Sequence, residues 1–211
     1  MRCSILHVAG ALFALSTTAN AATISFNTDP FEGSDARTTE GRQIVPNELF
    51  TTFDPATDVL QFDPIVFGIE KILFANGEIR SLPQTAVNFI VLETFDNDAN
   101  PATAFGAGAA ADLIADQLIE STPGFFIYFN SAFDVARLVF STDLSDRNAD
   151  LKVLARFTNL TGAAGREAFP SFTEENAELT AVPEPSSLLL VSSAGLAWFG
   201  RVAARRRRRE E

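Results

Sequence analysis

The chain has 211 residues and a formal net charge of −11, and its one cysteine (Cys3) and one histidine (His7) lie near the N-terminus. Residues 22–182 are enough for one domain with a core of its own. Without cysteine or histidine, they lack the side chains for disulfides, for His/Cys zinc sites, for haem ligation through His, and for Ser-His-Asp or Cys-His catalysis. This segment holds 24 acidic and nine basic residues, a charge of −15, which excludes nucleic acid and anionic membrane surfaces as partners.

The first 21 residues have the pattern of a Sec-type signal peptide. Arg2 supplies a positive charge, residues 5–15 are apolar, and Ala19 and Ala21 provide the small residues of an A-x-A cleavage site. An apolar stretch of this length is too short for a stable membrane span. We expect signal peptidase to cut after Ala21 during export by the Sec machinery. The alternative is an uncleaved anchor or a buried N-terminal helix.

Residues 22–94 have the pattern of short strands separated by turns. The Asp-Pro steps at Asp54 and Asp63 are turn signals, because proline presets φ and aspartate bonds its own backbone. The pair Asn76-Gly77 favours a type I′ hairpin turn. Strands are expected at 22–26, 58–62, 65–67 and 85–94, with a polar loop over 29–42 and a hairpin over 71–80.

The main helix is expected within residues 97–120. Asn100 is a suitable N-cap with Pro101 at the first helical position, and the regular helix is expected over 109–120. Apolar residues then face the core and acidic residues recur every four positions on the solvent side. The core-facing residues are Leu113, Ile114 and Leu118, and the acidic stripe is Asp112, Asp116 and Glu120.

Three strands are expected after the helix, at 125–129, 134–141 and 151–157. The first is apolar throughout, which is typical of a strand covered on both faces. The last alternates, so that Leu151, Val153, Ala155 and Phe157 are expected on one face. A short helix over 161–169 and a polar tether over 171–182 are expected to follow. The order predicts a β-rich α+β domain over residues 22–170, an antiparallel sheet or sandwich with one main helix.

The last thirty residues hold three features in a fixed order. Pro183-Glu184-Pro185 comes first, and residues 186–204 follow, long enough as a helix (about 28 Å) to cross a hydrocarbon core of about 30 Å. Six arginines mark the far end: Arg201, Arg205, Arg206, Arg207, Arg208 and Arg209. Because arginine costs about 2.5–3.5 kcal/mol at the bilayer centre, this end stays in the cytoplasm and the body lies outside it.

These features resemble the PEP-CTERM sorting signal of bacterial surface proteins, over residues 183–211. The resemblance implies processing by an exosortase, a multi-spanning membrane enzyme, with Pro183, Glu184 and Pro185 as its recognition triplet. It also implies a place on the cell surface or in the exopolysaccharide matrix of a Gram-negative biofilm. The protein would first be held in the inner membrane with its body in the periplasm, and then pass to the cell surface or the medium. A permanent single-span anchor without cutting is the simpler alternative. Glu210 and Glu211 depart from the pattern, but acidic residues weigh little in orientation.

Two loops offer oxygen ligands for Ca²⁺. The candidate ligands are Asp96, Asp98 and Asn100 in the first loop, and Asp143, Asp146 and Asp150 in the second. The first loop is not an EF-hand, because Pro101 and Ala107 occupy the positions that need glycine and an acid. Aspartate and asparagine also form turns and cap helices, so a turn-forming role stays open.

Three functional hypotheses follow from these patterns. The first is a non-enzymatic surface or matrix protein without a cofactor, the second a Ca²⁺-dependent adhesion or polysaccharide-binding module, and the third a carboxylate-based secreted hydrolase. Tyr128 is the only tyrosine and Trp198 the only tryptophan, so the aromatics that usually stack on sugars are scarce. No spacing singles out a pair of carboxylates for glycoside hydrolysis. The first hypothesis is the one we expect.

Overall fold

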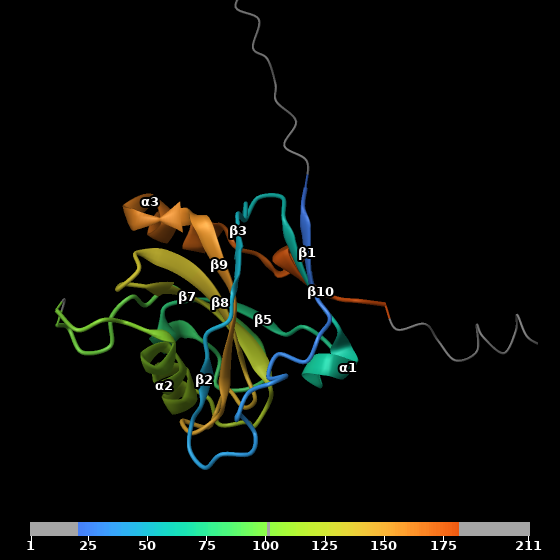
Figure 1. The fold of residues 1–211 in the computed structure, drawn as a ribbon. Helices are drawn as coiled ribbons and strands as arrows, with labels where there is room; N and C mark the ends of the chain where they lie inside the picture. The colour runs from blue at the N-terminus through green and yellow to red at the C-terminus, as the bar shows by residue number, and fades with distance from the viewer. Residues whose placement is uncertain (1–20, 101, 182–211) are drawn as a thin grey trace, which may run out of the picture.

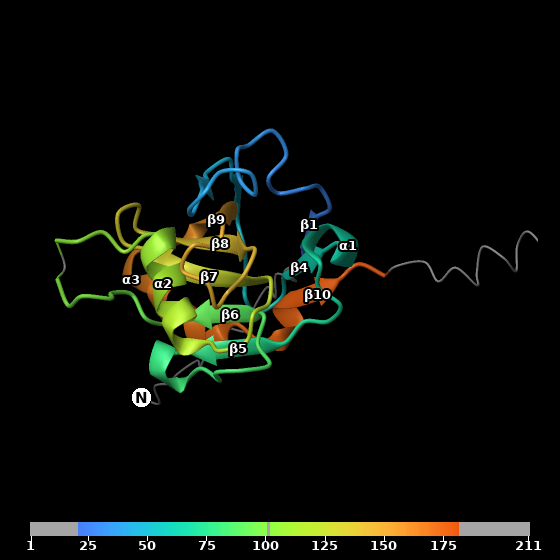
Figure 2. The same cartoon turned by 90° about the horizontal axis from the view of Figure 1, so that it is seen from below.

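The computed structural model describes residues 21–100 and 102–181, which form three layers (Figures 1 and 2). A large sheet lies in the middle, with a small sheet and α1 on one side and α2 on the other (Figure 2). The strands are β1 (Thr23–Phe26), β2 (Ile44–Val45), β3 (Leu49–Thr51), β4 (Val59–Phe62), β5 (Phe74–Gly77), β6 (Phe89–Leu92), β7 (Gly124–Asn130), β8 (Val135–Ser141), β9 (Leu151–Thr161) and β10 (Ala177–Leu179). The helices are α1 (Pro64–Phe67), α2 (Ala107–Gln117) and α3 (Gly162–Glu167), with short 3₁₀ turns at Ile79–Ser81, Phe169–Ser171 and Glu174–Asn176.

The β-rich α+β class is confirmed, but the expected antiparallel sheet is wrong. The large sheet has the order β2-β9-β8-β7-β6-β5, with β3 also paired to β9. Only the β7-β8 and β8-β9 pairs are antiparallel; β5, β6 and β7 run parallel to one another, and β2 and β3 run parallel to β9. The hairpin expected at Asn76-Gly77 is absent, because both residues belong to β5 and the chain crosses over to pair β5 parallel with β6. Parallel neighbours need such a crossover.

The small sheet contains β1, β4 and β10 in the order β1-β4-β10, all parallel. Residues 171–181 were expected to form a tether, but they belong to the folded body. Phe172 is buried in the core, and β10 pairs with β4. The segment is polar because the outer face of this sheet is solvated: Gln61 accepts a hydrogen bond from Ser25 and donates one to Glu178.

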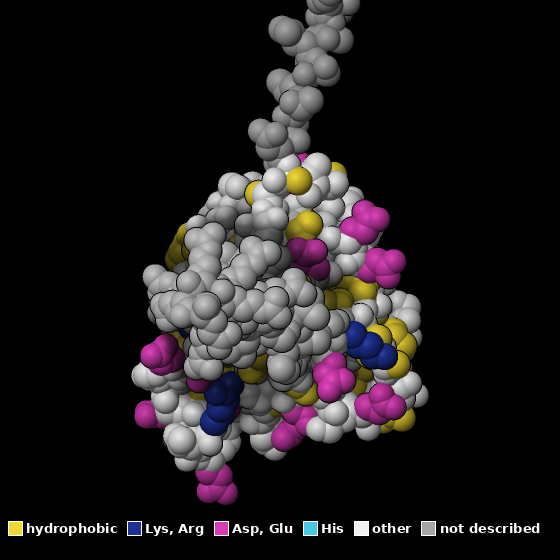
Figure 3. Space-filling view, turned by 90° about the vertical axis from the view of Figure 1, so that its right-hand side faces the viewer, with side chains coloured by type: hydrophobic (Ala, Val, Ile, Leu, Met, Phe, Trp, Pro, Cys, Tyr) yellow, Lys and Arg dark blue, Asp and Glu magenta, His cyan; other side chains and the backbone are white. Residues whose placement is uncertain are grey.

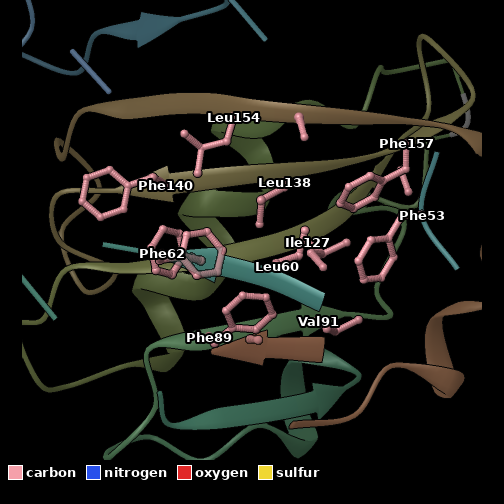
Figure 4. Close-up of a cluster of buried hydrophobic side chains, with 14 of the residues drawn as sticks. Phe53, Leu60, Phe62, Phe89, Val91, Ile127, Leu138, Phe140, Leu154 and Phe157 are labelled. Atoms are coloured by element: carbon pink, nitrogen blue, oxygen red, sulfur yellow. The ribbon is translucent and has the colours of Figure 1, made fainter. Parts of the chain in front are cut away.

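A phenylalanine-rich core fills the space between the two sheets (Figure 4). Phe62 on β4 lies over the large sheet at its centre, fully buried. Its ring stacks on that of Phe125 with centroids 3.9 Å apart, and it also contacts Phe67 and Phe89. Most of the phenylalanines in the described residues therefore serve as core.

A second core lies between the large sheet and α2. Ala110, Ala111 and Ile114 of the helix pack against apolar side chains of β6, β7 and β8. The helix was expected from Ala109 to Glu120, but it spans Ala107–Gln117, with Gly106 as N-cap. Leu118 turns to an extended conformation and ends it. Glu120 thus lies outside the helix and accepts a hydrogen bond from the Ala86 N–H.

The inward and acidic faces predicted for α2 are partly right. Ile114 and Leu118 are buried as expected, and Leu113 packs partly against the core. Two residues of the acidic stripe form ion pairs and do not face solvent alone: Asp112 pairs with Arg42 at 2.8 Å, and Asp116 pairs with Arg147.

The strand β9 does not keep one face toward one core. Leu151 and Val153 belong to the core under α2, whereas Ala155 and Phe157 belong to the core between the sheets. The register with β8 shifts at this point: Leu138 is paired with Ala155, but Val139 with Val153. Leu154 is the extra residue of a β-bulge, which reverses the facing of Ala155 and Phe157. The expectation of a single face was therefore wrong.

The strand expected at residues 65–67 is the helix α1. Asp63 caps it, with its carboxylate accepting from the N–H groups of Ile65 and Val66. Pro64 is the first residue of the helix, and Gly68 ends it in the left-handed conformation with φ 66°. The Asp-Pro pair and the following glycine were start and stop signals for a helix of one turn.

The strands β1, β4, β6 and β8 and the short helix α3 lie within their expected ranges, whereas β7 and β9 are confirmed but extend beyond the ranges expected for them. No helix in residues 21–100 and 102–181 has the length and apolar character of a membrane span. The predicted span at 186–204 lies outside the described residues.

Candidate functional site

The first proposed calcium loop is a series of turns. Asp96 accepts from the Asp98 N–H at 3.1 Å, Asp98 from the Asn100 N–H at 2.9 Å, and Asn100 from the Ala102 N–H at 3.1 Å. The Asn100 N–H bond is the main cause that lowers the pKa of Asp98. Each side chain bonds the backbone two residues on, as in successive Asx turns. Asn100 therefore caps a turn ahead of α2 and not the helix itself.

The acidic side chains of the second proposed calcium loop also accept hydrogen bonds from the protein itself. Asp143 accepts from the Ser121 and Ser145 hydroxyls and from the Thr122 N–H. Burial would raise the pKa of Asp143, but these hydrogen bonds outweigh it and the pKa is lowered. Asp146 accepts from the Asn148 N–H. In the part of the chain that the structure describes, no group of three or more acidic, histidine or cysteine side chains is arranged around a metal position.

Asp150 has a different role from the one predicted. It is buried at the start of β9, and its two oxygens accept from the N–H groups of Arg37, at 2.5 Å, and Gln43, at 2.7 Å. These bonds fix the long polar loop that follows β1 against the large sheet. This loop forms one wall of the pocket described next.

A pocket of about 340 Å³ opens between this loop, β1 and β9. Its volume is in the range of small-molecule sites. Lys152 supplies its one basic side chain, and Phe26 and Phe67 are its aromatic walls. The other polar residues that line it are Ser25, Thr28, Asp29, Glu32 and Asn47.

Lys152 is the unusual group of the pocket. It projects from β9 and is only 8% exposed. Within residues 21–100 and 102–181, no hydrogen bond or ion pair engages its ammonium. Burial lowers the pKa of Lys152, and the charge of Glu48 opposes this effect. The buried stem of Lys152 thus carries its ammonium to the open pocket, where it has no protein partner among the described residues.

Glu48 cannot serve as that partner, because two arginines already hold it. Its carboxylate accepts from Arg137 Nε at 2.8 Å and Nη2 at 2.6 Å, and from Arg156 Nη2 at 2.6 Å. The side chains of Glu48 and Arg137 are 5% and 9% exposed. Burial would raise the pKa of Glu48, but the bonds and charges of the two guanidinium groups outweigh it and lower the pKa. We call Glu48, Arg137 and Arg156 the Glu48 cluster.

The Glu48 cluster reaches the surface through Arg156. Its guanidinium lies 4.6 Å from the ring centre of Phe50 and 4.9 Å from that of Phe133. Both rings are more than half exposed. Two guanidinium groups share one carboxylate, so the cluster carries one net positive charge. The face in Figure 3 shows scattered acidic side chains with few basic ones.

The sequence patterns missed Lys152 and the Glu48 cluster. The three basic residues interrupt apolar strands, which is typical of solvent-facing positions. They are buried or half-buried because both faces of the large sheet are covered. A basic residue in a strand with apolar neighbours on both sides was the signal that could have found them.

The predicted processing residues lie mostly outside the described residues, including Ala19, the Pro183-Glu184-Pro185 triplet and the arginines from Arg201 onward. Ala21 is described and is exposed at the edge of the body. Comparisons with protein families, with curated proteins and with solved structures found no match to this chain.

Proposed function

We propose that this chain is an exported, non-enzymatic protein of the cell surface or extracellular matrix, associated with exopolysaccharide. An exosortase sorts it through Pro183-Glu184-Pro185. The observation that carries the proposal is the fit of the folded body between two processing signals. Strand β1 begins at Thr23, directly after the expected cut at Ala21. The last hydrogen bond of the small sheet, from Thr180 N–H to Phe62 O at 2.8 Å, lies just before Pro183.

The direction of the strands supports the same proposal. Both β1 and β10 run parallel to β4, so the chain enters the small sheet at one end and leaves it at the other (Figure 1). Ala21 and Ala181 are exposed. A protease at either signal would therefore act outside the packed core.

Replacing Glu184 by alanine should leave the protein in the inner membrane with an intact C-terminal tail. The reason is that the exosortase would lose the acidic residue of its recognition triplet. The measurement is the intact mass of the protein recovered from membrane and surface fractions. Glu178→Ala, on the solvated face of β10, is the matched control and should be processed like the wild type. A Glu184→Ala protein with the wild-type mature mass would overturn the proposal.

A second candidate function is favoured by the pocket around Lys152. The unpartnered ammonium suits a carboxylate, and the hydroxyl, amide and carboxylate groups around it suit the hydroxyls of a sugar ring. A single uronate residue of an acidic polysaccharide has this chemistry. Asp29 and Glu32 also line the pocket, and Asp29 is paired with Arg37, so Lys152 is the group that would meet the carboxylate of the uronate.

Sodium glucuronate should bind the wild-type protein saturably, and Lys152→Met should weaken this binding by about tenfold or more, since a charge-assisted hydrogen bond is lost. Titration calorimetry measures both. Lys71→Met, at an exposed position, is the matched control and should bind as the wild type does. Equal binding of glucose, or of acetate, would show that the pocket does not select a sugar acid and would overturn this candidate.

A further inference from the structure

We propose that removal of the signal peptide creates an ion pair between the new α-ammonium of Ala22 and the carboxylate of Asp58. This pair fastens both end strands of the small sheet. The inference rests on the proposed cut after Ala21, and it adds a consequence of that cut for the stability of the folded body.

The acceptor for the new N-terminus is already in place. The backbone nitrogen of Ala22 donates to Asp58 Oδ1 at 2.8 Å, and the Ala22 carbonyl accepts from Val59 N–H at 2.9 Å. Asp58 is only 7% exposed, and its second oxygen accepts from the Asp54 N–H at 2.8 Å. Ala22 is thus fixed on both sides at the point where the chain joins the sheet.

Cleavage changes the chemistry of this nitrogen without moving it. Water hydrolyses the peptide bond, Ala21 leaves with the new carboxylate, and Ala22 keeps the amine. An α-amine has a pKa of about 7.7–8.0 and is therefore mostly protonated at neutral pH. One neutral N–H donor becomes an ammonium with three donors and a positive charge. A hydrogen bond between two charged groups is about twice as strong as a neutral one, and burial of Asp58 limits screening by salt.

The same residue connects the other end of the body. The main-chain carbonyl of Asp58 accepts from Asn176 Nδ2 at 2.9 Å, and Asn176 is buried directly before β10. Leu60 and Phe62 of β4 then pair with Ala177 and Leu179 of β10. A bond that holds Asp58 therefore also steadies the strand that leads toward Pro183.

The strand β1 depends on this anchor more than a central strand would. It is an edge strand of four residues, and Ile24 and Phe26 are only half-buried. A short edge strand with little buried area opens easily. A charged anchor at its first residue would shift this local equilibrium toward the closed state.

The test uses the full-length chain, exported by a bacterial host and purified after processing. One variant carries a single glycine inserted between Ala21 and Ala22, which keeps the A-x-A site and leaves every body residue unchanged. The new amine then lies about 3.5 Å further out and Ala22 keeps a neutral N–H. Wild type and insertion are each made with Asp58 and with Asp58→Asn, and N-terminal sequencing and intact mass define every sample.

Hydrogen exchange at the Val59 and Thr180 amides reports the two ends of the small sheet. The insertion should speed exchange at both amides by about tenfold with Asp58 present, and much less in the Asp58→Asn background. If the mature protein does not begin at Ala22, both the ion pair and the proposed cut after Ala21 are overturned. If it begins at Ala22 and the insertion has no effect, or the same effect in both backgrounds, only the ion pair is overturned. If Asp58→Asn fails to fold, the exchange rates of the wild type and the insertion variant alone test the ion pair.

Discussion

Replacing Phe62 by alanine is expected to lower the free energy of unfolding by about 3–5 kcal/mol. Its ring is fully buried where the small sheet meets the large one, against Phe67, Phe89 and Phe125. Removing it takes away the apolar area and leaves a cavity. The three remaining rings cannot collapse into that space without breaking their contacts with one another.

Urea unfolding of the purified mature protein measures the effect of Phe62→Ala. Ile65→Ala is the matched control, because Ile65 lies on the neighbouring helix α1 and is 77% exposed. This control should change stability by no more than about 0.5 kcal/mol. Similar losses in the two variants would mean that β4 does not pack on the large sheet through Phe62.

Glu48→Gln is expected to destabilise the protein by about 3–5 kcal/mol, because it leaves the charges of Arg137 and Arg156 without their counter-ion. Glutamine has nearly the shape of glutamate, so packing is preserved and the loss is electrostatic. Phe50 and Phe133 can stabilise the Arg156 guanidinium through their rings, but each such contact is worth only about 0.5–1 kcal/mol at an exposed site. The carboxylate is therefore the main counter-charge of the two guanidinium groups at this edge of the large sheet.

The pH dependence gives this prediction a signature that loss of packing would not produce. The pKa of Glu48 is lowered in the folded state. Its contribution to stability is therefore fully present above the ordinary glutamate pKa of about 4.3 and is lost as the pH falls through the lowered pKa. Wild type and Glu48→Gln should differ by a constant amount near neutral pH and converge only in acid. Glu40→Gln, at an exposed position of the polar loop, is the control and should follow the wild type throughout. A gap that persists unchanged in acid would contradict the assignment.

Two contacts connect the first and the last segment of the folded body. Asp58 accepts from Ala22 through its side chain and from Asn176 through its carbonyl. The polar segment after α3 was expected to be a tether, but it contributes β10 to the small sheet. The sorting signal is thus expected to follow a folded strand with almost no spacer, so access of an exosortase to Pro183 should depend on how firmly β10 is held.

The sequence by itself determined the class of the fold and most of its elements. Apolar runs and alternation located β6, β7, β8 and β9, and the composition excluded thiol and imidazole chemistry between Ala22 and Val182. These are local properties, since each follows from the period of apolar residues in one segment. The helix α1 was also within reach, because its Asp-Pro start and glycine stop are local signals.

Only the tertiary structure decided the pairing and the chemistry of the pocket. Whether β5 pairs parallel or antiparallel with β6, and which core Leu151 and Phe157 face, depends on crossovers and on a bulge that no local period records. Glu48 meets Arg137 across 89 residues of chain, and burial of Lys152 needs a loop, β1 and β9 together. A charged side chain in a strand indicates a solvent-facing position until its neighbours in space are known. The reason is physical: burial and charge pairing are properties of contacts between distant segments, whereas a sequence pattern reports only the residues beside one another.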